Sequence, residues 1–224
     1  MKSLIRFFSL AFFLVLLNLT GQAQYLQFGV FADPQLSWFT SDTKKFSPNG
    51  SVFGFNAGFS LERYFADRYA ITTGASISNI GGNIKYKDEE YNTLKTRDGE
   101  YLLAVNSNVK VKAQYINVPL GLKFKTNEIG YTTFFAHLGV IGHVKLKGFA
   151  WEDTNGVDRE VLENKQLNFG FVSYMFGAGM QYSLGGPSAI QVGLTYANGM
   201  TAAFDAGYGM ISIGSLSLKL GLIF

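Results

Sequence analysis

The sequence ends in SLSLKLGLIF (215–224), a stretch in which apolar side chains alternate with mostly small or polar ones. One parity carries the bulky apolar residues Leu216, Leu218, Leu220, Leu222 and Phe224, and the other carries Ser215, Ser217, Lys219 and Gly221. A period of two predicts a β-strand, and about ten residues is the length that a tilted strand needs to cross a bilayer. Because an open strand edge leaves backbone groups unpaired in lipid, such a strand implies a closed barrel.

The composition agrees with a chain that faces lipid. Of its 224 residues 26 are glycine, 16% are aromatic, only 16% are charged and none is cysteine. A soluble domain carries nearer a quarter charged residues, and the lack of cysteine excludes disulfides and thiolate metal sites. Two of the 19 basic residues lie in the N-terminal segment, so the remainder nearly balances the 16 acidic residues and gives no signal for nucleic acid.

Residues 1–23 have the pattern of a secretory signal peptide. Two basic residues, Lys2 and Arg6, precede an apolar run, and small residues stand at positions −3 and −1 of a cleavage site after Ala23. The alternative is a retained helical anchor, but the run is too short to span a bilayer comfortably. We therefore predict a signal peptide over 1–23 and one outer-membrane β-barrel domain over 24–224.

Seven further alternating stretches precede the terminal one. They predict strands over 26–38, 53–62, 69–77, 115–124, 134–144, 172–183 and 190–196. Long polar loops are expected over 40–50, 81–114, 148–166 and 197–209, with short turns between the other pairs. Pro34 predicts a bulge or a break in the first strand's ladder. Long loops outside and short periplasmic turns are typical of outer-membrane barrels, so the predicted fold is all-β, an eight-stranded antiparallel up-and-down transmembrane barrel.

Alternation alone does not say which face is outside, since a soluble lipocalin-like barrel would turn its apolar face inward. An eight-stranded barrel has an interior just wide enough for side chains to fill. Here one parity carries the large aromatic and aliphatic residues and the other much of the Gly, Ser, Asn and Gln. Aromatic residues near the strand ends would form the two interfacial girdles of a membrane barrel: Trp38, Phe53 and Tyr196 at one rim, and Tyr69, Phe124, Phe134, Tyr182 and Phe224 at the other.

The stretch YINVPLGLKF (115–124) resembles the Y-I-x-[IV]-P-L-x-x-K-[FY] strand of the PorT-like outer-membrane β-barrel family of Bacteroidetes. Residues 168–171, followed by Gly-Ala-Gly at 177–179, resemble a later strand of that family, and the resemblance covers most of the mature chain. It implies an eight-stranded outer-membrane barrel. The family's namesake takes part in protein secretion and gliding machinery, but many members have no assigned activity, and no motif in this chain carries the secretion role.

The inward parity holds four charged residues: Asp33, Glu62, Lys123 and Lys219. Asp33 and Lys219 lie on the first and last strands, which become neighbours when the barrel closes. Because buried charges need partners, the sequence predicts a compensated charge network that plugs the interior. The alternative is a conduction path, for which eight strands leave little lumen.

His137 and His143 are the only histidines, and both have inward parity on one predicted strand. Six residues apart, they stand about 20 Å from each other along the strand, too far to share a metal without a bulge. Interior hydrogen bonding is the favoured interpretation, and we expect no metal or other cofactor. His143 is the one candidate base for an enzyme at the outer rim, and no motif supports that role. The Gly-x-Gly at 177–179 lies inside a strand and opens no helix, so it is not a nucleotide loop.

Two further features concern the membrane. Four lysines flank the longest predicted loop and would point outward, where they would meet either solvent or lipid phosphates: Lys85, Lys87, Lys110 and Lys112. Phe224 ends the last strand on its lipid-facing parity, which in the barrels that this chain resembles is the assembly signal read by the insertion machinery.

We therefore expect a non-enzymatic outer-membrane barrel protein, structural or interaction-mediating through its extracellular loops. One alternative is a PorT-like component of a protein secretion or gliding assembly, and another is a barrel-rim enzyme, either a hydrolase or an acyltransferase. The expected partners are outer-membrane lipid and the barrel-insertion machinery, with secretion-assembly proteins under the first alternative and no nucleic acid.

Overall fold

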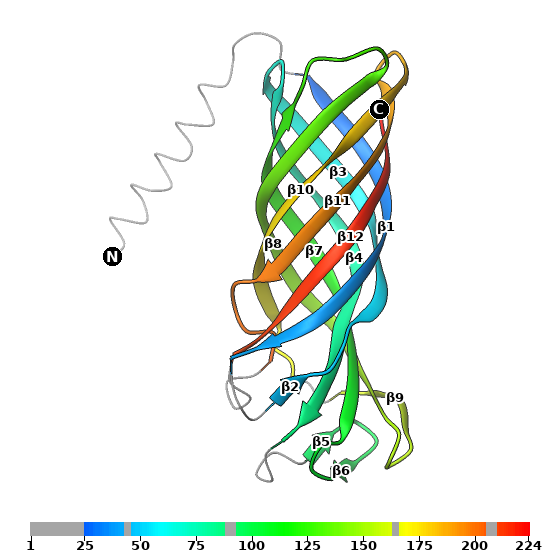
Figure 1. The fold of residues 1–224 in the computed structure, drawn as a ribbon, viewed down its shortest axis with the longest axis vertical. Coiled ribbons are helices and arrows are strands. Elements are labelled where there is room, and N and C mark those ends of the chain that lie inside the picture. The colour runs from blue at the N-terminus through cyan, green and yellow to red at the C-terminus, as the bar shows by residue number, and fades with distance from the viewer. Residues whose placement is uncertain (1–24, 43–45, 88–92, 163–165, 205–209) are drawn as a thin grey trace, which may run out of the picture.

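The computed structural model describes residues 25–42, 46–87, 93–162, 166–204 and 210–224. Within these ranges, eight long antiparallel strands form a closed barrel (Figure 1): β1 Leu26–Ser41, β3 Val52–Ala66, β4 Tyr69–Tyr86, β7 Asn108–Lys125, β8 Thr132–Glu152, β10 Gly170–Gly185, β11 Ser188–Gly199 and β12 Ile211–Ile223. Each strand pairs with the next, and β12 pairs with β1. The predicted fold class is confirmed, and the predicted signal peptide lies outside the described residues. No helix in the described ranges is long and apolar enough to cross a membrane.

The two ends of the barrel differ. At one end, here called the short-turn end, the connections are brief and the C-terminus lies beside the start of β1: Phe224 exchanges backbone hydrogen bonds of 2.8 and 2.9 Å with Phe28. The other, the long-loop end, carries four small strands (Figure 1): β2 Phe46–Pro48, β5 Thr93–Lys95, β6 Glu100–Leu102 and β9 Val157–Val161. β5 and β6 form a hairpin, β2 adds to β4, and β9 adds to β8.

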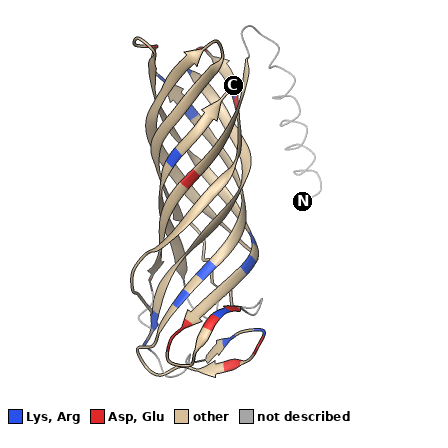
Figure 2. Ribbon diagram, turned by 90° about the vertical axis from the view of Figure 1, so that its right-hand side faces the viewer, with Lys and Arg blue, Asp and Glu red and all other residues tan. Residues whose placement is uncertain are grey.

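The outward face is apolar along the middle of the barrel, as the sequence predicts. The bulky parity of β12 (Leu216, Leu218, Leu220, Leu222 and Phe224) is 40–53% exposed. Aromatic pairs lie toward the rims, with Trp38 against Tyr196 at 6.2 Å between ring centroids and Tyr69 against Phe124 at 5.7 Å. Figure 2 shows that charged residues are sparse in the middle of the wall and gather toward the long-loop end. The wall is therefore built to face hydrocarbon.

Most strands run a few residues beyond their predicted bounds, and three of them extend by seven to nine residues at one end. β4 continues to Tyr86, β7 begins at Asn108 and β8 continues to Glu152, so parts of the expected loops 81–114 and 148–166 are strand instead. The prediction was wrong there because apolar residues were sought on the lipid-facing parity. In these extensions they occupy the inward parity, and the buried residues are Ile80, Ile84, Val109, Val111, Ala113 and Ala150.

The break predicted at Pro34 is present on one side of β1. The β1–β3 ladder runs through this position, with Pro34 opposite Phe55. The β1–β12 ladder instead passes from Phe31↔Gly221 directly to Gln35↔Ser217. Proline has no N–H to donate to that ladder, and the interruption lies beside one of the predicted interior charges.

Candidate functional site

A charged network crosses the barrel interior toward the short-turn end. Lys123 on β7 donates to Glu62 Oε1 on β3 at 2.5 Å and to Gln191 Oε1 on β11 at 2.8 Å, and both charged residues are under 5% exposed. The Tyr64 hydroxyl donates to Glu62 Oε2 at 2.8 Å, and Gln181 Nε2 donates to Gln191 Oε1 at 2.9 Å. The network therefore joins four strands across the barrel interior.

Aromatic and basic residues lie beside this network. The Tyr25 and Tyr64 rings are stacked, with centroids 4.3 Å apart. Lys125 Nζ lies 4.5 Å from the centre of the Tyr64 ring and donates to Gln27 Oε1 at 3.1 Å. These groups close the barrel toward the short-turn end.

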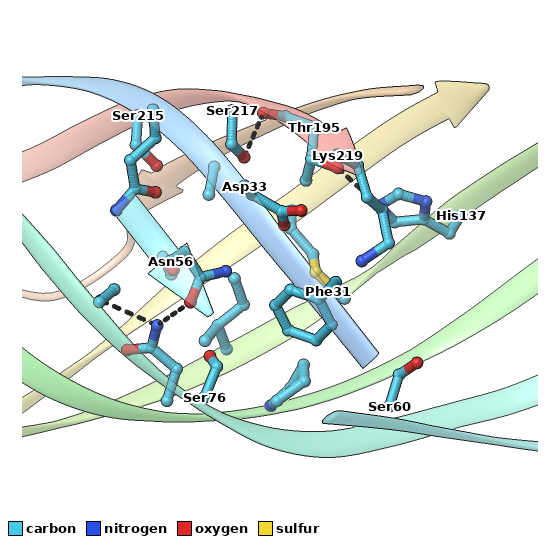
Figure 3. Close-up of a pocket in the computed structure, with 18 of the residues that line it drawn as sticks. Phe31, Asp33, Asn56, Ser60, Ser76, His137, Thr195, Ser215, Ser217 and Lys219 are labelled. Carbon is cyan, nitrogen blue, oxygen red and sulfur yellow. Dashed lines mark hydrogen bonds between the residues drawn. The ribbon is translucent and has the colours of Figure 1, made fainter. Parts of the chain in front are cut away.

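The other predicted charges, Asp33 and Lys219, lie near the middle of the barrel. Their strands are neighbours, and both side chains point into the same interior space (Figure 3). Asp33 Oδ1 accepts a hydrogen bond of 3.0 Å from the Leu220 backbone N–H, in the gap that Pro34 opens. Lys219 Nζ lies 4.2 Å from the centre of the Phe31 ring. The structure thus brings the two residues together but gives each a main contact that the sequence did not predict.

A cavity of about 120 Å³ lies between these groups, large enough for several water molecules. Along its wall, the Ser217 hydroxyl donates to the Thr195 carbonyl at 3.2 Å, and the Thr195 hydroxyl lies 3.2 Å from His137 Nε2 (Figure 3). His137 is therefore a hydrogen-bonding residue of the interior.

His143 is held in a second interior network. Its Nε2 lies 2.7 Å from Ser173 Oγ, and its Nδ1 lies 2.8 Å from Asn117 Oδ1. The amide oxygen fixes the proton on Nδ1, so Nε2 accepts from the serine hydroxyl. Ser173 and Asn117 were missed as partners, although in the register of β7 and β8 Asn117 stands directly opposite His143. Within the described ranges, no group of three or more His, Asp or Glu residues could hold a metal ion.

Serine, histidine and asparagine in this order match a nucleophile, a base and a group that orients the base. Burial opposes such a role, because Ser173 is 1% exposed and the His143 ring is stacked against Phe171 at 4.1 Å between centroids. Tyr115 packs edge-on against the same ring at 6.1 Å. The three polar side chains satisfy one another by hydrogen bonds, and they line the same interior cavity as Asp33 and Lys219.

At the long-loop end, the barrel mouth is filled by an apolar core. Four leucines of the loops contribute to it: Leu94, Leu103, Leu162 and Leu167. They are buried together with inward residues of six barrel strands: Phe39, Ile80, Ile84, Val109, Val111, Ala113, Tyr115, Ala150, Phe171, Ile211 and Ile213. We call the loop residues 93–107, 153–162, 166–169 and 200–204 the loop cap.

Polar contacts tie the loop cap together. Glu160 on β9 accepts hydrogen bonds from the Thr96 hydroxyl at 2.6 Å and the Tyr101 hydroxyl at 2.7 Å. The backbone N–H of Arg97 donates to the Val161 carbonyl at 2.9 Å. The hydrogen bond to Glu160 raises the pKa of Tyr101. The β5–β6 hairpin and β9 therefore form one folded unit over the mouth.

The predicted lysines lie on the extended strands. Lys85, Lys110 and Lys112 have outward parity on β4 and β7, and Lys87 is exposed just after β4. Lys147 on β8 joins this face and was missed. The β7–β8 ladder pairs Tyr115 with Lys145 and Gln114 with Lys147, so a bulge at the intervening residue changes the parity of β8.

Several solved outer-membrane protein structures are similar to this chain, each with low identity. The Neisserial surface protein A is 12% identical, with 88% of this chain and 95% of that chain covered and a TM-score of 0.47. Ail of Yersinia pestis is 16% identical, with 88% and 98% covered and a TM-score of 0.40. The outer membrane protease OmpT of Escherichia coli is 8% identical, with 92% and 99% covered and a TM-score of 0.44. No curated protein sequence matches the chain.

A family model described as "Outer membrane protein beta-barrel domain" matches residues 20–205, most of the chain. This match agrees with the closed barrel, the apolar outward wall and the asymmetry of the two ends. The chain belongs to the outer membrane protein beta-barrel domain family, and its place is the outer membrane.

Proposed function

We propose that this protein is a non-enzymatic, non-conducting outer-membrane barrel that acts through its loop cap, as a structural or interaction-mediating protein. Outer-membrane barrels carry their long loops outside the cell, so the loop cap is extracellular. The observation that carries the proposal is the filled barrel mouth, where four loop leucines are buried in one core with the barrel strands. Binding residues are found disproportionately on loops that a rigid scaffold positions, and this core holds the cap in place on the barrel.

The interior supports the non-conducting part of the proposal. The Glu62–Lys123 network crosses one half of the barrel, and the apolar core fills the other. The cavity between them measures about 120 Å³, room for several water molecules. Purified protein in planar lipid bilayers is expected to give no discrete conductance steps under conditions in which a porin control does. Regular steps from the folded protein would contradict this.

A crosslinking experiment tests the interaction role. A photo-crosslinking amino acid is placed at Leu102, which is 77% exposed on the loop cap, and as a matched control at Ile129, which is 67% exposed on a short turn at the opposite end. Irradiation of intact cells is expected to give an adduct of defined mass from the Leu102 position and none from the Ile129 position. The opposite pattern would move the interaction to the periplasmic side and contradict a role for the cap.

The first alternative is a PorT-like component of a secretion or gliding assembly. The resemblance over 115–124 supports it, but these residues serve the barrel itself. Asn117 and Lys123 bond inside the barrel, while Leu120 and Leu122 are exposed on the lipid-facing side. A deletion strain that fails to secrete a surface protein, and is restored by the intact gene, would favour this alternative over the broader proposal.

The second alternative is a rim hydrolase or acyltransferase, and its one structural support is the Ser173–His143–Asn117 order. A fluorophosphonate probe reacts with a serine that a neighbouring base activates. We expect no labelling of the folded protein, because Ser173 is buried. Labelling that Ser173→Ala and His143→Ala both abolish would establish the enzyme instead.

A further inference from the structure

We propose that the outward face of the β7 and β8 extensions binds the phosphate groups of lipids in the outer leaflet. The site, here called the basic collar, consists of Lys110, Lys112, Lys147, Phe149 and Trp151. It retains two of the four lysines predicted from the sequence and adds three residues that the sequence did not single out.

Strand register brings the collar together on one face. Lys110 stands opposite Trp151, Lys112 opposite Phe149, and Gln114 opposite Lys147. Neighbouring strands lie about 4.8 Å apart, and residues two apart on one strand are about 7 Å apart. Three ammonium groups and two aromatic rings therefore share a patch of the size of a lipid headgroup.

The positive charge of the collar is not compensated on its own face. Among the outward positions of β4, β7 and β8 in the described ranges, no residue is Asp or Glu. On the adjoining β9, Glu160 accepts hydrogen bonds from Thr96 and Tyr101, and the one other acid, Asp158, is exposed beside Arg159. The nearest acid along the chain, Glu152, is buried, and its carboxylate accepts hydrogen bonds from the backbone N–H groups of Thr154 and Asn155. The collar cations therefore remain available to an external anion.

Aromatic rings hold the cations against the wall. Lys110 Nζ lies 4.8 Å from the centre of the Trp151 ring, and the Arg159 guanidinium lies 5.2 Å from the centre of the Phe149 ring. Basic side chains beside aromatic rings are typical of the interface between lipid and water. Arg159, on β9, adds positive charge at the edge of the collar.

The position of the collar along the wall indicates a lipid as the occupant. Ile116 is the last apolar residue of the lipid-facing parity on β7. At about 3.4 Å per residue, Lys147, opposite Gln114, stands about 7 Å beyond it along the strand, and Lys112 about 14 Å. These distances, reduced by the strand tilt, place both ammonium groups at headgroup depth, within reach of phosphates.

The distance along the strand beyond Ile116 places the two other predicted lysines outside the collar. Lys85 stands opposite Asn108, about 27 Å beyond Ile116 along the wall, and Lys87 lies further still. Both are too far above the apolar belt to touch headgroup phosphates of the same leaflet. They carry the same charge on the same side of the barrel and so form a matched control.

The test compares lipids and variants by native mass spectrometry of the folded protein in detergent. Wild-type protein is offered lipid A and its fully dephosphorylated form, and we expect retention of the phosphorylated lipid only. Lys112→Gln with Lys147→Gln is expected to weaken retention about 30-fold, from about 1 kcal/mol per lysine and 1.4 kcal/mol per tenfold. Lys85→Gln with Lys87→Gln should leave retention unchanged, and Lys112→Arg with Lys147→Arg should keep it.

Three results would overturn the proposal. The first is equal retention of both lipids by wild-type protein, a comparison that needs no variant. The second is an equal loss, or no loss, in the two glutamine pairs, because general charge and not this site would then govern binding. The third is displacement of lipid A by a soluble sulfated polysaccharide that binds more tightly to the same lysines, which would assign the collar to a soluble polyanion.

Discussion

β7 passes through two environments, and its two halves carry opposite chemistry on the same alternation. In the membrane half, Leu120 points outward and Asn117 inward. In the extension, Lys112 points outward and Val111 is buried inward. The phase of the strand is unbroken, but the apolar side chains move from the outer face to the inner face where lipid gives way to water. The solvent decides which face is apolar, and the strand geometry only provides two faces.

The two halves also differ in the interactions that stabilise them. The interior of the membrane half is lined largely by polar and charged side chains, among them Glu62, Asn117 and Lys123, so its stability depends on hydrogen bonds and charge pairs. The extension buries leucine, isoleucine and phenylalanine side chains as a soluble domain does. Substitutions of interior residues should therefore destabilise the two halves for different reasons: an unpaired buried charge in the membrane half, and a cavity in the extension. The following predictions test this difference.

The largest expected effect is in the membrane half. Lys123→Met leaves the Glu62 carboxylate buried without its cation and should lower the free energy of unfolding by about 3–5 kcal/mol. Denaturant unfolding in lipid vesicles measures it. Lys123→Met combined with Glu62→Gln should recover part of the loss, and a single variant as stable as wild type would show that the pair contributes nothing.

The next effect is in the extension. Ile84→Ala leaves a cavity in the apolar core and should cost about 2–5 kcal/mol. The loss should be local, so that protease cuts the loop cap while the barrel still migrates faster on unboiled gels. Ile77→Ala, an outward position on the same strand that is 45% exposed, is the control and should cost less. Equal costs would mean that the two halves do not differ as described.

A smaller effect is expected at the second interior pair. Lys219→Met should cost about 1–3 kcal/mol, because Asp33 keeps its hydrogen bond to the Leu220 backbone. A double-mutant cycle with Asp33→Asn should give a weaker coupling energy than the Glu62–Lys123 cycle. Equal coupling in the two cycles would mean that Asp33 and Lys219 interact as strongly as a direct ion pair.

The smallest effect on stability is expected at the rim of the short-turn end. Phe224 is 53% exposed, and its deletion removes one strand-end hydrogen-bond pair and part of an apolar contact. Full burial of such a side chain is worth about 1.5–3 kcal/mol, and the half-exposed ring should contribute about half of that. If Phe224 is the assembly signal, deletion should lower the amount that reaches the outer membrane far more than the stability of refolded protein. Equal losses in the two assays would show a packing residue only.

The sequence alone determined the architecture. Alternation along the terminal strand, the balance of large and small residues on the two parities and the spacing of long and short connections were enough to predict an eight-stranded barrel with the correct face outside. These features are local: each strand crosses the same hydrocarbon and must repeat the same pattern, so the pattern can be read one strand at a time.

The partners of the interior residues were decided only by the tertiary structure. That Lys123 bonds Glu62 and Gln191, or that His143 bonds Ser173 and Asn117, depends on the stagger between strands and on bulges such as the one before Lys147. The loop cap was likewise decided only by the tertiary structure. Its leucines lie far apart in the sequence and show no periodicity, and they meet only in the mouth of the closed barrel. Local alternation specifies the face on which a residue lies, whereas its neighbours there follow from the register of a closed sheet.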